Sequence, residues 1–293
     1  MTQFANNTAQ VAANPANGVT ALDAESRLLA LIAENKSAIV AYSGGLDSAL
    51  VLWGCVQALG ATQTLAVTSI SPSYATGEAD AARAFAISIG LPIDRHRFIL
   101  TREMEIAGYY LNSPERCYFC KGELYAEVEK IRVAEGYVVL FDGLNASDLT
   151  DFRPGRKAAH ERGVRSPLLE CGVTKEVARA IARRHQLMVS DKPASPCLAS
   201  RVPHGVRITD AILAQIDRAE AALKAMGLAG FRVRYHGDTA RVELAPDDLP
   251  RTQSEEFCRE VVMRVKGGGF LDVTIDTRGY RMGSLNPPTV DKE

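Results

Sequence analysis

The sequence predicts an α/β protein: a parallel-sheet domain followed by a smaller α+β domain. Short apolar runs alternate with segments of helical periodicity over the first two thirds of the chain, which is typical of a parallel sheet covered by helices. A proline-rich stretch around Pro193 then leads into a hairpin pattern. The 293 residues also exceed one typical domain of about 100–200 residues. We expect a disordered tail over residues 1–19, a first domain over 20–190 and a second over 191–293.

The first domain is expected to alternate strand and helix throughout. Its strands are short apolar runs bounded by turn residues, and several of its helices end at a glycine that can cap them. Ligands of such sheets bind at the carboxyl ends of the strands, so the residues that follow each strand are the candidates for a site. Strands are expected at residues 37–42, 64–70, 93–100, 137–142 and 187–190, and helices at 22–32, 46–59, 77–89, 121–135 and 174–185.

The second domain is expected to pack helices against a small antiparallel sheet. Two short runs of strand character flank His236-Gly237-Asp238, which is typical of a hairpin turn. Strands are expected at residues 231–235, 239–244 and 270–277, and helices at 209–226 and 253–265.

Composition restricts the classes of function. The formal net charge is −1, so the chain lacks the global basic field of a non-specific nucleic-acid binder. No apolar run approaches the roughly 20 residues of a membrane helix, and no signal peptide is evident, so we expect a cytoplasmic protein without a membrane partner. In that compartment the six cysteines stay reduced, and paired ones indicate metal ligands or catalytic thiols.

A glycine-containing loop follows the first expected strand and opens the next helix. Its sequence is SGGLDS, from Ser43 to Ser48. Glycines let the backbone approach an anion, and the unpaired N–H groups of a helix start attract phosphate. Asp47 is unusual among phosphate-binding groups unless it holds a cation or orients the helix start. The Walker A and dinucleotide-binding patterns are absent, so the sequence does not favour a kinase, a GTPase or a dehydrogenase.

This motif resembles the PP-loop of the ATP pyrophosphatase family. The resemblance implies adenylation chemistry, in which a substrate oxygen attacks the α-phosphate of ATP, pyrophosphate leaves, and a nucleophile then displaces AMP. It also implies Mg²⁺ as the companion of ATP, with Asp47 and Glu243 as possible ligands of a divalent cation. Glu243, on the partner strand of the expected hairpin, could instead balance Arg232 and Arg234. Thr68 and Gly143, which follow other strands, would lie beside the adenosine. The loop residues that would cradle the pyrophosphate end of ATP are Ser43, Gly44, Gly45, Asp47 and Ser48.

Three further segments narrow the resemblance to the LarE family of sulfur transferases. They are DGLNASD at residues 142–148 with RPG at 153–155, ASPCLASR at 194–201, and GYRMGSLN at 279–286. The resemblance implies that ATP adenylates a carboxylate of pyridinium-3,5-biscarboxylic acid mononucleotide and that sulfur then replaces AMP. Two cycles would give the bisthiocarboxylic acid of the nickel-pincer cofactor. The partner would be this small nucleotide, and the protein would be a homo-oligomer, possibly a hexamer.

Local charge agrees with an anionic substrate. Residues 151–218 carry 13 Lys and Arg against seven Asp and Glu, inside a nearly neutral chain. Arg232 and Arg234 alternate along a strand, so both are expected on one face, either as a solvated surface or as ligands of the substrate phosphate. The resemblance adds Arg201 and Arg281 as substrate-binding residues.

The cysteines suggest two possible sources of sulfur. Cys197 stands where the LarE family has its sulfur-donating cysteine, whose loss of sulfur would leave dehydroalanine, and Arg201 is expected to lower its pKa. Cys117 and Cys120 form a CxxC pair just before an expected helix, with no second pair at zinc-finger spacing. Together the three thiols resemble the LarE subgroup in which three cysteines hold a [4Fe-4S] cluster that carries sulfur. We favour the cluster over sacrificial donation.

Other functions remain open at this stage. A tRNA-thiolating PP-loop enzyme would share the loop and the three cysteines, but it predicts a basic tract or a zinc-binding RNA module, and the sequence shows neither. An ammonia-using ligase would not need the three thiols, and neither would a nucleotide sensor that never cleaves ATP.

Overall fold

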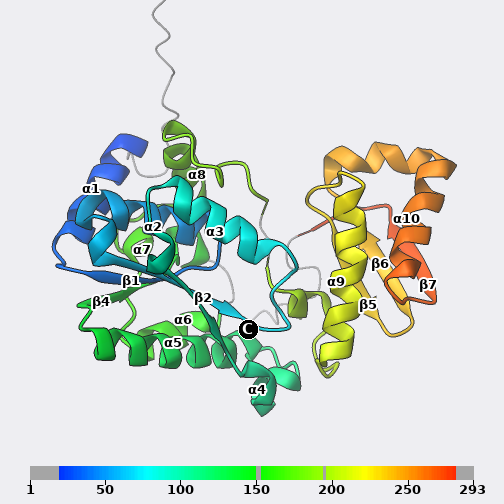
Figure 1. Ribbon diagram of the computed structural model, residues 1–293. Helices are drawn as coiled ribbons and strands as arrows, with labels where there is room; N and C mark the ends of the chain where they lie inside the picture. The colour runs from blue at the N-terminus through cyan, green and yellow to red at the C-terminus, as the bar shows by residue number, and fades with distance from the viewer. Residues whose placement is uncertain (1–19, 150–152, 194–195, 282–293) are drawn as a thin grey trace, which may run out of the picture.

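The computed structural model describes residues 20–149, 153–193 and 196–281, which form two sheets with their helices (Figure 1). The tail expected over residues 1–19 lies outside the described residues. Within the described residues, no helix is both long enough and apolar enough to cross a membrane.

The first sheet is parallel and has the order β3-β2-β1-β4. Its central strand β1 (Ala38–Ala41) is buried along its whole length, which explains why it reads as an unbroken apolar run. The others are β2 (Thr64–Ile70), β3 (His96–Leu100) and β4 (Val139–Phe141). The expected parallel sheet is confirmed, but residues 187–190 form turns and no fifth strand.

Helices cover both faces of this sheet, as alternate residues of β1 require. Ala38 and Val40 pack on one side with α1 (Ala21–Ala33), α2 (Leu46–Leu59), α3 (Glu78–Ser88), α7 (Pro167–Glu170) and α8 (Lys175–Arg184). Ile39 and Ala41 pack on the other side with α5 (Arg116–Glu135) and α6 (Gly155–Glu161). In Figure 1 the ribbons of α5 and α6 run below the sheet, and α1, α2 and α7 lie above it.

The second domain packs two helices against a three-stranded sheet. The hairpin of β5 (Arg232–His236) and β6 (Thr239–Glu243) is antiparallel, as expected. The third strand, β7 (Asp272–Asp276), pairs parallel with β6, so the expectation of an antiparallel sheet is wrong there. The physical reason is that α10 (Glu255–Gly267) carries the chain back along the sheet between them, beside α9 (Asp210–Ala225).

One correction bears directly on the site. Helix α5 begins at Arg116, five residues before the expected start, so Cys117 and Cys120 lie inside its first turns. Short helical turns connect the remaining elements: η1 (Ala61–Gln63), η2 (Ile93–Arg95), η3 (Glu103–Glu105), α4 (Ala107–Tyr110), η4 (Ala146–Leu149), η5 (Leu198–Arg201) and η6 (Pro246–Gln253).

A segment of the first domain is built into the core of the second. Tyr109 on α4 packs in the same apolar cluster as Leu198 and Ala199. The Asn112 side chain donates to the carbonyl of Pro203 at 2.7 Å, and the amide of Ile208 donates to the carbonyl of Tyr110 at 2.8 Å. This connection, residues 103–116, holds the start of α5 beside the turn η5.

Candidate active site

The PP-loop lies where β1 passes into α2. The backbone of Gly44 has φ +78°, a value that favours glycine, and it turns the chain sharply before the helix. The hydroxyls of Ser43 and Ser48 lie 3.1 Å apart, and the Ser43 amide donates to Ser48 Oγ at 3.2 Å. Gly45, the residue before α2, brings no side chain to cap the first N–H groups of the helix. These donors are therefore available to an anion.

Gly143 supports the loop from behind. A Cβ at this position would lie 2.5 Å from the Ser48 nitrogen, so only glycine lets the end of β4 approach α2 this closely. Thr68 is buried at the end of β2; its hydroxyl lies 2.6 Å from the Tyr42 carbonyl and 2.9 Å from His96 Nε2. The prediction that Thr68 and Gly143 border the adenosine stays a prediction.

Asp47 has the properties of a cation ligand. Its Oδ1 is buried and has no hydrogen-bond partner among the residues that the structure describes. Burial raises the pKa of Asp47, the Lys175 ammonium 3.6 Å away acts to lower it, and the neighbouring Asp148 raises it again. A divalent cation would satisfy the unpaired oxygen and relieve the repulsion between the two carboxylates. Asp47 therefore fits the Mg²⁺ expected with ATP.

The structure brings the three cysteines near one another. Burial raises the pKa of Cys120, and the charge of Cys197 is the second cause; the same two causes raise the pKa of Cys117, although part of that side chain reaches solvent. All three are free thiols. Within the described part of the chain they are not grouped tightly enough to hold a single metal ion. Iron–sulfur clusters are held by cysteine thiolates, so three free thiols are the right kind of ligand for such a group.

Arg116 is the cation beside these thiols, and sequence reasoning missed it. Its side chain is buried, donates to the carbonyl of Ala199 at 3.0 Å and also contacts the side chain of Asn112. The charges of Cys197 and Cys117 raise the pKa of Arg116 against the effect of burial. Arg116 directly precedes Cys117 in the sequence, and this position could have indicated a residue near the thiols. Arg116 thus ties α5 to the turn that follows Cys197.

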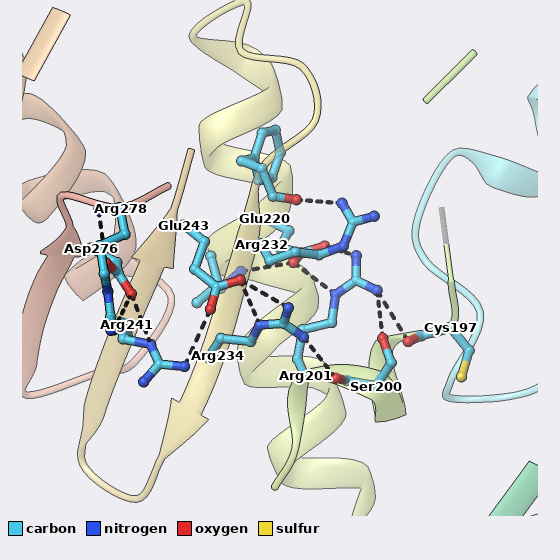
Figure 2. A network of polar contacts seen from close by, with 12 residues as sticks. Cys197, Ser200, Arg201, Glu220, Arg232, Arg234, Arg241, Glu243, Asp276 and Arg278 are labelled. Carbon is cyan, nitrogen blue, oxygen red and sulfur yellow. Dashed lines mark hydrogen bonds and ion pairs between the residues drawn. The ribbon is translucent and has the colours of Figure 1, made fainter. Parts of the chain in front are cut away.

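Arg201 binds the backbone of the cysteine turn. Its guanidinium donates to the backbone carbonyl of Cys197 at 3.1 Å and pairs with Glu220 at 2.8 Å. Figure 2 shows the Cys197 sulfur on the side of its residue away from this guanidinium. Arg201 therefore fixes the backbone of the cysteine turn, and its expected effect on the thiol stays a prediction.

A network of charged groups extends from this turn across the second sheet (Figure 2). Arg234 pairs with Glu243 at 2.8 Å and donates to the Ser200 carbonyl at 3.0 Å. Both Arg232 and Arg234 are only 5% exposed, so they do not form a solvated surface. The network holds five guanidiniums against three carboxylates: Arg201, Arg232, Arg234, Arg241 and Arg278 against Glu220, Glu243 and Asp276.

The excess of positive charge affects the pKa of Arg232. Burial lowers the pKa of Arg232, and the nearby charge of Arg201 lowers it further, while its guanidinium stacks 4.7 Å from the ring centre of Tyr280. Arg201, Arg232 and Lys192 all line one cavity of about 470 Å³ between the two domains. An anion in this cavity would relieve the crowding of the arginines.

Glu243 and Arg281 are the remaining expected site residues, and the ion pairs of Glu243 agree with the expectation that it balances the arginines of the strand. Glu243 is 1% exposed and its two oxygens face Arg234 and Arg241, so it is occupied by ion pairs rather than poised for a divalent cation. Arg281 is exposed at the last described position.

Comparison with known proteins gives the family of the chain. Residues 30–130 match the family model described as NAD synthase. The chain is 32% identical over 265 residues to pyridinium-3,5-bisthiocarboxylic acid mononucleotide synthase of Lactiplantibacillus plantarum, which covers 89% of this chain and 93% of the relative. The chain belongs to the LarE family. It is therefore an ATP-dependent enzyme with a PP-loop domain.

Other members of the family are less well described. An uncharacterised protein of Synechocystis sp. is 41% identical over 249 residues, covering 85% of this chain and 91% of the relative. An uncharacterised protein of Methanocaldococcus jannaschii is 29% identical over 248 residues, covering 85% and 92%.

Lys192 is a further residue of this LarE-family site that the motif analysis missed. It lies in the connection between the domains, and its ammonium donates to the Gly44 carbonyl at 2.9 Å and pairs with Glu78 at 2.7 Å. Its position in the proline-rich stretch between the domains could have indicated Lys192 from the sequence. Lys192 links the PP-loop to the cavity lined by Arg201 and Arg232.

Proposed function

We propose that this protein adenylates the carboxylates of pyridinium-3,5-biscarboxylic acid mononucleotide and replaces AMP with sulfur. The observation that carries the proposal is the juxtaposition of its parts. A phosphate-binding loop, an arginine-rich cavity and three converging thiols occur together in a chain with 32% identity to a synthase of the bisthiocarboxylic product. Each part has a distinct task in the two half-reactions.

The first half-reaction belongs to the PP-loop and Asp47. The N–H groups at the start of α2 bind the pyrophosphate portion of ATP, and Asp47 holds the Mg²⁺ that neutralises it. A substrate carboxylate oxygen attacks the α-phosphorus, the bond to the β-phosphate oxygen breaks, and pyrophosphate leaves with the electron pair. The Lys192 contact to Gly44 keeps the loop in the conformation that receives the phosphates.

The arginine-rich cavity orients the substrate. A phosphate ester placed between Arg201 and Arg232 gains charge-assisted hydrogen bonds from groups that are already desolvated. Because the cysteine turn is hydrogen-bonded to the same Arg201, the substrate phosphate and the thiols are positioned by one network. This arrangement favours a small anionic nucleotide over an RNA.

The second half-reaction uses the three thiols. Cys117, Cys120 and Cys197 would hold a [4Fe-4S] cluster, which would supply hydrosulfide as the sulfur nucleophile. In this half-reaction a C–S bond forms at the adenylated carbonyl, the C–O bond to AMP breaks with its electron pair, and the proton of the hydrosulfide is released. Arg116 holds the Cys197 turn against the start of α5, the helix that carries Cys117 and Cys120.

The decisive experiment is single-turnover and multiple-turnover assay of anaerobically purified protein with ATP, Mg²⁺, the dicarboxylate nucleotide and sulfide. We expect pyrophosphate release that depends on the nucleotide, exchange of carboxylate oxygen for sulfur by mass spectrometry, and several products per protein. An intact-protein mass that shows loss of H₂S with one sulfur transferred per chain would instead support sacrificial donation from Cys197. Release of pyrophosphate with a tRNA, and not with the nucleotide, would contradict the substrate.

Association is a separate part of the proposal. The LarE resemblance implies a homo-oligomer such as a hexamer. Light scattering on the purified chain measures the state directly, and a monomer at working concentration would contradict this part alone.

A further inference from the structure

Two buried polar atoms near the thiols have no hydrogen-bond partner among the described residues. They are the hydroxyl of Tyr109 and Oε2 of Glu103, and each residue is only 1% exposed. Leaving such an atom unpaired costs about 1–3 kcal/mol, and folded proteins contain few of them. Two together, six residues apart on the connection between the domains, indicate a polar ligand.

Both atoms lie beside the thiols that the mechanism uses. Tyr109 packs in the same apolar cluster as Cys120 and Cys197. Burial raises the pKa of Tyr109, and the charge of Cys197 raises it further. The nearby Ser73 hydroxyl acts in the opposite sense, but it makes no hydrogen bond to the Tyr109 hydroxyl and is bonded instead to Ser71 and Glu103. Tyr109 therefore remains a hydroxyl, able to donate. The charge of Glu103 is also one of the causes, after burial and Cys197, that raise the pKa of Cys120.

Ser73 fixes this group relative to Cys197. Its hydroxyl donates to Glu103 Oε1 at 3.4 Å, which leaves Oε2 as the unpaired oxygen. Its carbonyl accepts the amide of Leu198, the residue after Cys197, at 2.8 Å. The two unpaired atoms are therefore held in a set position next to the cysteine turn.

We propose that Tyr109 and Glu103 form a subsite that binds hydrosulfide beside Cys120 and Cys197. A hydrosulfide has one proton to donate and lone pairs to accept, so its sulfur receives the Tyr109 hydroxyl and its S–H faces Glu103 Oε2. A carboxylate or a fully ionised phosphate has no proton to give to Glu103 Oε2, whereas a hydrosulfide keeps one. The inference rests on the proposed function and names the residues that deliver its sulfur.

The test uses sodium sulfide as the probe and the full chain, purified without oxygen. Tyr109→Phe and Glu103→Gln remove the donor and the charged acceptor with little change of volume. Tyr110→Phe and Glu105→Gln, which lie on the same two turns, are the matched controls. Each protein is titrated with sulfide, and both the bound sulfide in equilibrium dialysis and the sulfide dependence of thiocarboxylate formation are measured. We expect the half-saturating sulfide concentration to rise about tenfold in both test variants, the loss of roughly one hydrogen bond, and to stay unchanged in the controls.

Folding and adenylation are followed separately. Because Tyr109→Phe removes an unpaired buried hydroxyl, we expect its melting temperature without sulfide to equal or exceed that of the wild type. ATP–pyrophosphate exchange with the dicarboxylate nucleotide reports the first half-reaction alone. If exchange is normal but both test variants bind sulfide as the controls do, the subsite is refuted and the proposed function stands. If the wild type shows no exchange with the nucleotide, the proposed function fails, and the dialysis still decides the subsite.

Discussion

Replacing Gly143 with alanine should disable ATP use without unfolding the protein. The new Cβ would lie 2.5 Å from the Ser48 nitrogen, 2.8 Å from Ser48 Cα and 3.0 Å from the carbonyl carbon of Asp47. Carbon atoms pack at about 3.5–4.0 Å, so β4 and the start of α2 must separate by about 1 Å. All three obstacles are backbone atoms of a helix, which cannot rotate away as a side chain can.

The expected cost follows from that displacement. Overpacking of this kind destabilises a protein by about 1–3 kcal/mol, which a domain of ordinary stability survives. A shift of about 1 Å in a positioning group can reduce a catalytic rate about 100-fold. We therefore expect Gly143→Ala to lower ATP–pyrophosphate exchange by about two orders of magnitude and to weaken ATP binding in calorimetry, with a modest fall in melting temperature.

Gly122 offers the matched control. It lies within α5, and a Cβ there would meet no atom within 4 Å, so Gly122→Ala should gain up to about 1 kcal/mol of helix stability and exchange pyrophosphate normally. Normal ATP affinity and normal exchange in Gly143→Ala would refute the reasoning that Gly143 sets the position of the PP-loop.

Three further changes test other parts of the structure. Cys117→Ala should lower the iron and labile sulfide of anaerobically purified protein at least several-fold. Cys258→Ala is the control, because the Cys258 thiol lies 3.1 Å from the Thr252 carbonyl and should leave both contents unchanged. Equal iron in both variants would contradict the three-thiol site. Lys192→Met should raise the dissociation constant for ATP about tenfold, since it removes one charged hydrogen bond to Gly44, and an unchanged constant in calorimetry would contradict that role. Burial lowers the pKa of His96 to about 4 in the folded protein, so as pH falls below about 6.5 the unfolded chain binds this proton first. The contribution of neutral His96 to the free energy of unfolding should be complete above that pH and fall by about 2 kcal/mol by pH 5. Urea unfolding at pH 7 and pH 5 checks this, and His96→Gln should flatten the difference.

The elements that depend on local pattern were predictable from the sequence. The apolar run of β1 and the turn at Gly44 follow from neighbouring residues alone, as does the helix after Ser48. The start of α5 was missed because Glu115, which precedes it, makes no side-chain cap, so the usual signal of a helix N-terminus is absent. The direction of β7 was missed because it depends on the docking of α10, which no short stretch of sequence encodes.

Some site residues could likewise be predicted from short stretches of sequence, whereas others depend on contacts with distant elements. The SGGLDS motif and Cys197 could be recognised in the sequence, because each lies in a short pattern of residue types. The burial of Arg232 and Arg234 could not, since alternating arginines on a strand normally face solvent. They are buried because carboxylates from other elements compensate them: Glu243 lies on the partner strand, and Glu220 comes from α9.

The convergence of the thiols has a similar long-range cause. Cys120 and Cys197 are 77 positions apart, and no pairing of strands joins their segments. What joins them is the segment before α5: the Asn112 side chain holds the carbonyl of Pro203, and Arg116 holds that of Ala199. The first domain contributes these side chains to the second domain at the point where the proposed sulfur site takes two thiols from one domain and a third from the other. In this proposal the contacts between the domains are part of the sulfur site, and not only the means of holding two units together.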